Sequence, residues 1–128
     1  MSNPIKVVCA IIVDGQKVLA AKRPIHKDQG GLWEFPGGKL HDNETPTEGI
    51  QREILEELGV DIEVIGQQRS IIHRYPTKNI ELIPLLAKIV GGNMQLTEHD
   101  EVCWVDISHL QSISWCAADR LLLQQLAL

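Results

Sequence analysis

Short apolar runs separated by turn residues cover most of the chain, and they predict a structure rich in strands. The run at residues 7–13 is largely β-branched, Asp14 and Gly15 follow it as a turn signal, and a second run covers residues 17–21. Two such runs joined by a tight turn predict a β-hairpin. Further strands are predicted at residues 62–68, 70–75, 80–90 and 102–107, with loops or turns around residues 30–31, 36–38 and 91–93.

Two helices are predicted to pack on these strands. The first covers residues 46–58, because Thr45 and Glu48 have capping-box spacing around a proline and Gly59 suits the left-handed residue that ends a helix. The leucine-rich segment 117–128 is predicted as a closing helix. The side of the first helix predicted to face the core contains Thr47, Ile50, Ile54 and Leu58. Strands with helices packed on them indicate an α+β or layered α/β architecture, and 128 residues fit one domain over residues 1–128.

The composition is that of an ordinary globular protein, with 44% hydrophobic and 23% charged residues. A formal net charge of −5 argues against a nucleic-acid polymer as partner, because binding to phosphate backbones needs an excess of basic residues. Cys9, Cys103 and Cys116 are odd in number and widely spaced, which argues against disulfides and zinc and favours a cytoplasmic setting. The first apolar run is too short to cross a membrane. No heptad pattern predicts an oligomeric state.

Three carboxylates fall within an arc of about 100° on another side of the predicted 46–58 helix, namely Glu53, Glu56 and Glu57. Like charges at these spacings destabilise an isolated helix by a few tenths of a kcal/mol per pair, roughly. One interpretation is a solvated acidic surface, which is common on helices. The other is a site for Mg²⁺, which prefers carboxylate and carbonyl oxygens and often bridges carboxylates to substrate phosphates.

The residues around these glutamates resemble a known family motif. Gly38 is followed by Glu44 after five residues and by Arg52-Glu53 after seven more, and Glu56, Glu57 and Gly59 follow at set spacings. This pattern resembles the Nudix box, GX5EX7REUXEEXGU with U aliphatic, at every defined position. The resemblance implies a mixed β-sheet between helices, an α/β/α sandwich in which the box forms a loop–helix–loop. It also implies hydrolysis of a phosphoric anhydride with Mg²⁺, or Mn²⁺ as its substitute.

The resemblance assigns roles within the box. The expected metal ligands are Gly37 or Gly38 through a carbonyl, Glu53, Glu56, Glu57 and Glu98. Glu53, positioned by Arg52, is the first candidate for general base, and Glu98 is the second. Glu44 is expected to reach the metal cluster or its waters, and Gly38, Glu44, Arg52 and Gly59 are the structural positions of the box. Gly49 lies on the acidic side of the helix, either to leave room for a packed loop or as a tolerated weak point.

Residues 33–39 also resemble the segment before the box in MutT-type nucleoside triphosphate pyrophosphohydrolases. That similarity implies contacts to the triphosphate from Arg23 and Lys78 and a base-reading role for Asp119. The expected substrate-binding residues are Arg23, Glu34, Phe35, Pro36, Gly37, Lys39, Lys78 and Asp119. Asp119 has two other interpretations, as a helix cap or as the partner of Arg120 or another surface residue. Trp33 and Trp115 could stack on a base or pack in the core.

The expected function is hydrolysis of 8-oxo-dGTP, a small-molecule substrate, to its monophosphate. CTP or a 5-substituted dCTP is the alternative, because relatives that prefer cytosine nucleotides also have an Ala-Asp pair where this chain has Ala118-Asp119. A nucleotide-binding module without catalysis is the alternative from another class, and such modules have generally lost the box glutamates that this chain keeps. The five histidines are assigned to surface or loop positions without a chemical role: His26, His41, His73, His99 and His109.

Overall fold

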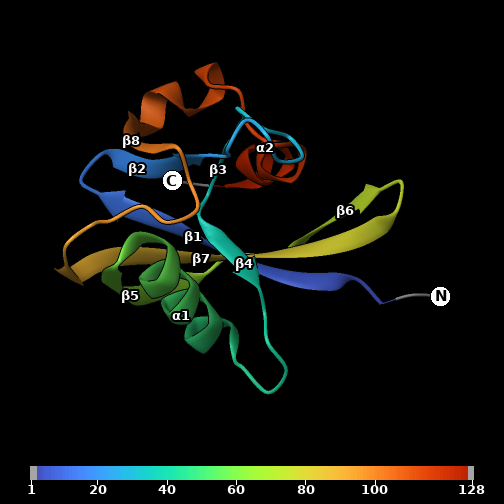
Figure 1. The fold of residues 1–128 in the computed structure, drawn as a ribbon, viewed down its shortest axis with the longest axis horizontal. Helices are drawn as coiled ribbons and strands as arrows, with labels where there is room; N and C mark the ends of the chain where they lie inside the picture. The colour runs from blue at the N-terminus through green and yellow to red at the C-terminus, as the bar shows by residue number, and fades with distance from the viewer. Residues whose placement is uncertain (1–2, 127–128) are drawn as a thin grey trace.

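A computed structural model describes residues 3–126. Its elements, in chain order, are β1 (Ile5–Asp14), β2 (Lys17–Lys22), β3 (Trp33–Glu34), β4 (Gly37–Lys39), α1 (Pro46–Leu58), β5 (Val60–Gln67), β6 (Ile71–Tyr75), β7 (Lys78–Gly92), β8 (Glu101–Asp106), the 3₁₀ helix η1 (Ile107–Ser112) and α2 (Ala117–Gln125). Figure 1 shows α1 and α2 on opposite sides of the sheet. Among the residues described, no helix is long and apolar enough to cross a membrane.

The centre of the mixed sheet is β1, which runs parallel to β7 from the Ile5–Ile80 pair to the Ile12–Ala87 pair. Its other edge is shared, because β2 pairs antiparallel with the end of β1 and β4 pairs antiparallel with its beginning. The partners of β4 are Val7, Val8 and Cys9, which face Lys39, Gly38 and Gly37. Gly37 and Gly38 are therefore held against β1, the central strand of the sheet.

Strand β7 is long because it has two successive partners on its other edge. β6 pairs with it up to Leu82, and β5 pairs with it from Leu85 onwards. Pro84 lies between the residues of β7 that pair with β6 and those that pair with β5. Proline has no N–H to donate, and at this position neither of these two pairings needs one. Its carbonyl accepts a hydrogen bond from the Gln68 N–H at 2.9 Å, in the connection from β5 to β6.

Alternating apolar residues of the central strands build one core on each face of the sheet. Val8, Ala10 and Ile12 of β1 point to the side covered by α1. Cys9 and Ile11 point to the side covered by α2. Because both faces are apolar and covered, these strands have continuous hydrophobic sequences. The expected α/β/α sandwich is confirmed.

Most of the predicted elements are present, and the clearest is α1. Thr45 Oγ1 accepts from the Glu48 N–H at 3.1 Å and Glu48 Oε1 accepts from the Thr45 N–H at 2.9 Å, so the capping box is confirmed. Gly59 follows with a φ of 70°, the left-handed conformation expected of it. The placement of Thr47 in the core was wrong. Thr47 is exposed in the first turn of α1, and the core face begins with Ile50.

Other differences concern segments whose structure depends on distant partners. β3, β4 and η1 were not predicted, and Gly91 and Gly92 extend β7 rather than form a turn. The closing helix ends at Gln125, and residues 127–128 of the predicted range 117–128 lie outside the described part of the chain. Strand pairing thus imposed β structure on glycine-rich segments with little tendency of their own to form it.

Candidate active site

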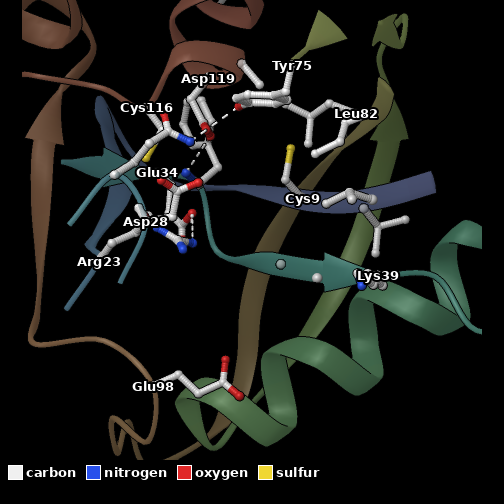
Figure 2. Close-up of a pocket in the computed structure, with 18 of the residues that line it drawn as sticks. Cys9, Arg23, Asp28, Glu34, Lys39, Tyr75, Leu82, Glu98, Cys116 and Asp119 are labelled. Atoms are coloured by element: carbon white, nitrogen blue, oxygen red, sulfur yellow. Dashed lines mark hydrogen bonds and ion pairs between the residues drawn. The ribbon is translucent and has the colours of Figure 1, made fainter. Parts of the chain in front are cut away.

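A pocket of about 300 Å³ opens on the side of the sheet where β4 meets β1. Its walls come from β1, β4, β7, the loop after β2 and the beginning of α2, with Glu57 of α1 and Glu98 at its edge. Figure 2 shows Asp119, Cys116 and Glu34 at one end of the opening and Glu98 beside α1 at the other. We call these the Asp119 end and the Glu57 end of the pocket.

Arg52 organises the box by binding three carboxylates. It donates from Nε and Nη2 to the two oxygens of Glu44, at 2.6 and 3.1 Å, and from Nη1 to Glu53 Oε1 at 2.9 Å. The same Nη1 lies 3.3 Å from Glu56 Oε2, and Nη2 donates to the Lys39 carbonyl at 3.2 Å. The forked guanidinium therefore joins α1 to the loop before it and to the end of β4.

Glu44 serves this network with both of its oxygens. Its hydrogen bonds from the Arg52 side chain and from the His41 N–H lower the pKa of Glu44 to about 2. Both oxygens accept from Arg52, so Glu44 ties the loop to the helix. Its expected reach to the metal cluster or its waters stays a prediction.

Two glycines leave space that any side chain would fill. A Cβ on Gly38 would lie 2.5 Å from the carboxylate of Glu53, and a Cβ on Gly49 would lie 2.5 Å from Leu40 Cδ1. Of the two interpretations of Gly49, the structure supports room for a packed loop. Gly38 allows the backbone of β4 to approach the acidic side of α1 directly.

The three carboxylates of α1 differ greatly in exposure. The side chain of Glu56 is 60% exposed, that of Glu53 13% and that of Glu57 2%. Burial, followed by the close side-chain contact with Glu53 and the charges of Glu98 and Glu34, raises the pKa of Glu57 to about 10. Within the described residues, neither carboxylate oxygen of Glu57 has a hydrogen-bond partner. A buried carboxyl without partners is costly unless it binds a ligand, and a hard cation is the ligand it fits.

His99 belongs to the site, which the assignment of all five histidines to chemically idle positions did not foresee. Its side chain is only 4% exposed, its Nε2 lies 2.8 Å from Glu34 Oε2, and its Nδ1 lies 3.6 Å from Glu57 Oε2. The only sequence signal was its position next to Glu98. Sequence reasoning also missed Gln29, whose Oε1 accepts from the Ala117 N–H at the start of α2 at 3.0 Å.

At the other end, Asp119 is 7% exposed and points into the pocket from the first turn of α2. Its Oδ1 accepts from the Phe35 N–H at 2.9 Å. Burial is the main cause that raises the pKa of Asp119 to about 7. The two alternative interpretations of Asp119 were wrong, because α2 has no side-chain cap and Arg120 instead donates to the Ile113 carbonyl.

The tryptophans belong to the packing of the molecule. Trp115 is 3% exposed, stacks on Phe35 with ring centroids 4.7 Å apart, and donates to the Leu110 carbonyl. Trp33 is half-buried in β3, beside Lys22. Tyr75 also lines the opening (Figure 2), and its hydroxyl accepts from Gln29 Nε2 at 3.4 Å.

Seven of the eight expected substrate-binding residues line the pocket, and they are Arg23, Glu34, Phe35, Gly37, Lys39, Lys78 and Asp119. Pro36 does not. It is buried behind the wall, where its carbonyl accepts from the Ala10 N–H at 2.8 Å. Arg23 donates to Glu34 Oε1 at 3.2 Å and to the Asp28 carbonyl at 2.8 Å. Of the expected metal ligands, Gly37, Gly38, Glu57 and Glu98 line the pocket, and Glu53 lies directly behind Gly38.

A family model described as NUDIX domain matches residues 7–125. The chain belongs to the Nudix family. It is 40% identical over 88 residues to an 8-oxo-dGTP diphosphatase of Proteus vulgaris, covering 69% of this chain and 77% of that protein. It is 37% identical over 100 residues to a CTP pyrophosphohydrolase of Escherichia coli, covering 78% and 74%. The solution structure of the E. coli ORF135 protein superimposes with a TM-score of 0.84 at 33% identity, over 95% of this chain and 87% of that one.

The protein is therefore a Nudix hydrolase of the MutT type, an enzyme acting on phosphoric anhydride bonds. Nudix hydrolases generally use a divalent metal ion, and the partnerless oxygens of Glu57 suit such an ion. The buried Glu57 shows that the acidic side of α1 is not wholly a solvated surface. This Nudix chain keeps the box glutamates, so it is not one of the binding modules that have lost them.

Proposed function

We propose that this Nudix hydrolase uses Mg²⁺ to convert a nucleoside triphosphate into its monophosphate and pyrophosphate, with 8-oxo-dGTP as the preferred substrate. One observation carries the proposal. A single pocket joins a buried hydrogen-bond acceptor at the Asp119 end to a buried, partnerless carboxylate at the Glu57 end. Such a pocket suits a ligand with a polar base at one end and a charged phosphate chain at the other.

The residues that would hold Mg²⁺ are Glu53, Glu56, Glu57, Glu98 and a carbonyl of Gly37 or Gly38, and Mn²⁺ would substitute. When bound, the ion neutralises the phosphate charge and makes a water molecule more acidic. Without it, a phosphate chain would meet an acidic protein whose formal net charge is −5. The arrangement therefore fits a hard cation placed between two groups of negative charge.

The chain itself supplies the proton acceptor and the cationic contacts. Glu53 is the proposed general base, because Arg52 binds only its Oε1 and leaves Oε2 to accept a proton from water. Glu98, exposed at the edge of the pocket, is the second candidate. Arg23, Lys39 and Lys78 line the opening and would stabilise charge on the phosphoryl oxygens.

Asp119 is the proposed base-reading residue. Its Oδ1 is occupied by the Phe35 N–H, so Oδ2 is the atom available to a base. A carboxylate accepts from N–H donors, which 8-oxoguanine presents on several edges and cytosine presents at its amino group. CTP or a 5-substituted dCTP is therefore the second candidate, and the Ala118-Asp119 pair favours it. The names of the Proteus vulgaris and E. coli relatives support both candidates.

Steady-state release of pyrophosphate with Mg²⁺ separates the candidates when 8-oxo-dGTP, dGTP, CTP and 5-methyl-dCTP are compared side by side. The proposal expects the highest kcat/KM for 8-oxo-dGTP. The highest value for a cytosine nucleotide would replace that substrate, and the absence of turnover on all four would refute the proposed function. Glu53→Gln should lose roughly two to four orders of magnitude in kcat while still folding, whereas wild-type turnover would refute the assignment of the base.

A further inference from the structure

The loop between β7 and β8, residues 93–100, has no regular secondary structure, yet hydrogen bonds hold it at both ends. The N–H groups of Gln95 and Thr97 donate to the last two carbonyls of α1, at 2.8 and 3.2 Å. The Asp100 N–H donates to the last carbonyl of β2 at 3.2 Å. The loop is therefore fixed between α1 and β2, and this fixes the backbone that carries His99.

The imidazole of His99 lies between two carboxylates that belong to different ends of the pocket. Its Nε2 is 2.8 Å from Glu34 Oε2, which is a hydrogen-bond distance. Glu34 in turn accepts from Arg23 through its other oxygen, at 3.2 Å. On the opposite edge of the ring, Nδ1 faces Glu57 Oε2 at 3.6 Å. A continuous chain of contacts thus runs Arg23, Glu34, His99, Glu57.

The Glu57 end of this chain lacks ordinary hydrogen bonds. Nδ1 of His99 and both oxygens of Glu57 are buried, and among the residues described none of the three atoms has a hydrogen-bond partner. The imidazole edge and the Glu53 side chain are therefore the polar groups beside the Glu57 carboxylate, and the imidazole is the one that joins it to Glu34. If His99 only filled space in the core, an apolar side chain would serve better. Burying its polar Nδ1 beside the carboxylate of Glu57 is costly, because neither group gains a hydrogen bond there.

We propose that His99 is a positioning residue that orients Glu57 for metal binding and couples it, through Glu34, to Arg23 at the nucleotide-binding side of the pocket. The inference rests on the proposed function, because it gives Glu57 the role of a metal ligand. Residues that orient a ligand of a metal typically change its affinity about 10- to 100-fold when they are replaced. The contact chain further requires that a change at Glu34 alters metal affinity more while His99 is present than after His99 has been replaced.

The test measures Mn²⁺ binding to the nucleotide-free protein from the electron paramagnetic resonance signal of the free ion. His99→Leu, which fills the buried space without a polar edge, should raise the Kd for Mn²⁺ about tenfold. Glu34→Gln should raise it severalfold in the wild-type background and have a clearly smaller effect in His99→Leu. His109→Leu is the matched control, because the His109 side chain is 70% exposed and should leave the Kd unchanged.

Far-ultraviolet circular dichroism and thermal unfolding accompany each variant. If His99→Leu does not fold, His99→Gln takes its place with the same expected rise in Kd. A lower melting temperature with unchanged Mn²⁺ affinity would overturn the inference, because it would show a purely structural role. Equal effects of Glu34→Gln in both backgrounds would overturn the coupling. If the unmodified chain binds no Mn²⁺, the proposed function fails first and the inference fails with it.

Discussion

Glu57→Gln replaces the most buried of the three carboxyl groups of α1. Burial, followed by the neighbouring carboxylates, raises the pKa of Glu57 to about 10, so the metal-free side chain is neutral at pH 7. Binding to Mg²⁺ requires the ionised form. Each ion that binds through Glu57 must therefore release a proton.

The magnitude follows from proton linkage. With one proton released per ion, the apparent affinity for Mg²⁺ should rise about tenfold per pH unit between roughly pH 7 and 9, or about 1.4 kcal/mol per unit. The free energy of unfolding of the metal-free protein changes with pH in the opposite direction, and it falls as the pH rises. The folded state binds the Glu57 proton more tightly than the unfolded state, so this contribution is complete below the ordinary pKa of 4.5 and is lost as pH rises towards 10. The raised pKa of Asp119, about 7, also makes the free energy of unfolding fall as the pH rises, but only up to about pH 7.

Isothermal titration with MgCl₂ in two buffers of different ionisation enthalpy gives the number of protons released per ion. We expect about one proton for the wild-type chain and none for Glu57→Gln, whose remaining Mg²⁺ affinity should be weak and independent of pH. Urea unfolding in EDTA between pH 7.5 and 9 checks the stability slope. Glu63→Gln is the control, because the side chain of Glu63 is 58% exposed and lies on β5. Wild-type Mg²⁺ binding that releases no proton and does not change with pH would refute the reasoning.

Three further substitutions test other parts of the site. Gly38→Ala should lower kcat at least tenfold with little change in unfolding free energy, since its Cβ would displace the Glu53 carboxylate 2.5 Å away; unchanged steady-state kinetics would contradict this. Thr45→Ala should cost about 1 kcal/mol in urea unfolding and leave KM unchanged, because it removes only the cap of α1. Asp119→Asn should change the ratio of kcat/KM for 8-oxo-dGTP over CTP and flatten the stability slope between roughly pH 4 and 7, and an unaltered ratio would exclude base reading by Asp119.

The parts of the fold that the sequence predicts are those that local chemistry determines. The ends of α1 follow from Thr45, Glu48 and Gly59, each of which acts on its own neighbours. The strands β3 and β4 were missed because they are only two and three residues long and because Pro36, Gly37 and Gly38 disfavour a strand. Their extended form depends on pairing with β2 and β1, which the sequence does not reveal locally.

The same distinction applies within the site. Helical periodicity predicts the angles of Glu53, Glu56 and Glu57 around α1, but exposure depends on what packs above each of them. Glu57 is buried because the loop 93–100 closes over the end of the helix, whereas Glu56 remains exposed. His99 was missed for this reason, since its environment is created where a loop meets two elements that are distant in sequence.

Residues 34–39 connect the two ends of the pocket, because this one segment contacts groups at both of them. The Phe35 N–H holds Asp119 at one end of this segment, and the Lys39 carbonyl accepts from Arg52 at the other. Between them, Gly38 pairs with the central strand β1 and lies against the carboxylate of Glu53. A shift of this segment along β1 would therefore move the backbone partner of Asp119 and the box together. Substitution of Asp119, which lies outside the segment, is therefore the first way to test whether base preference can change while the metal-binding geometry stays intact.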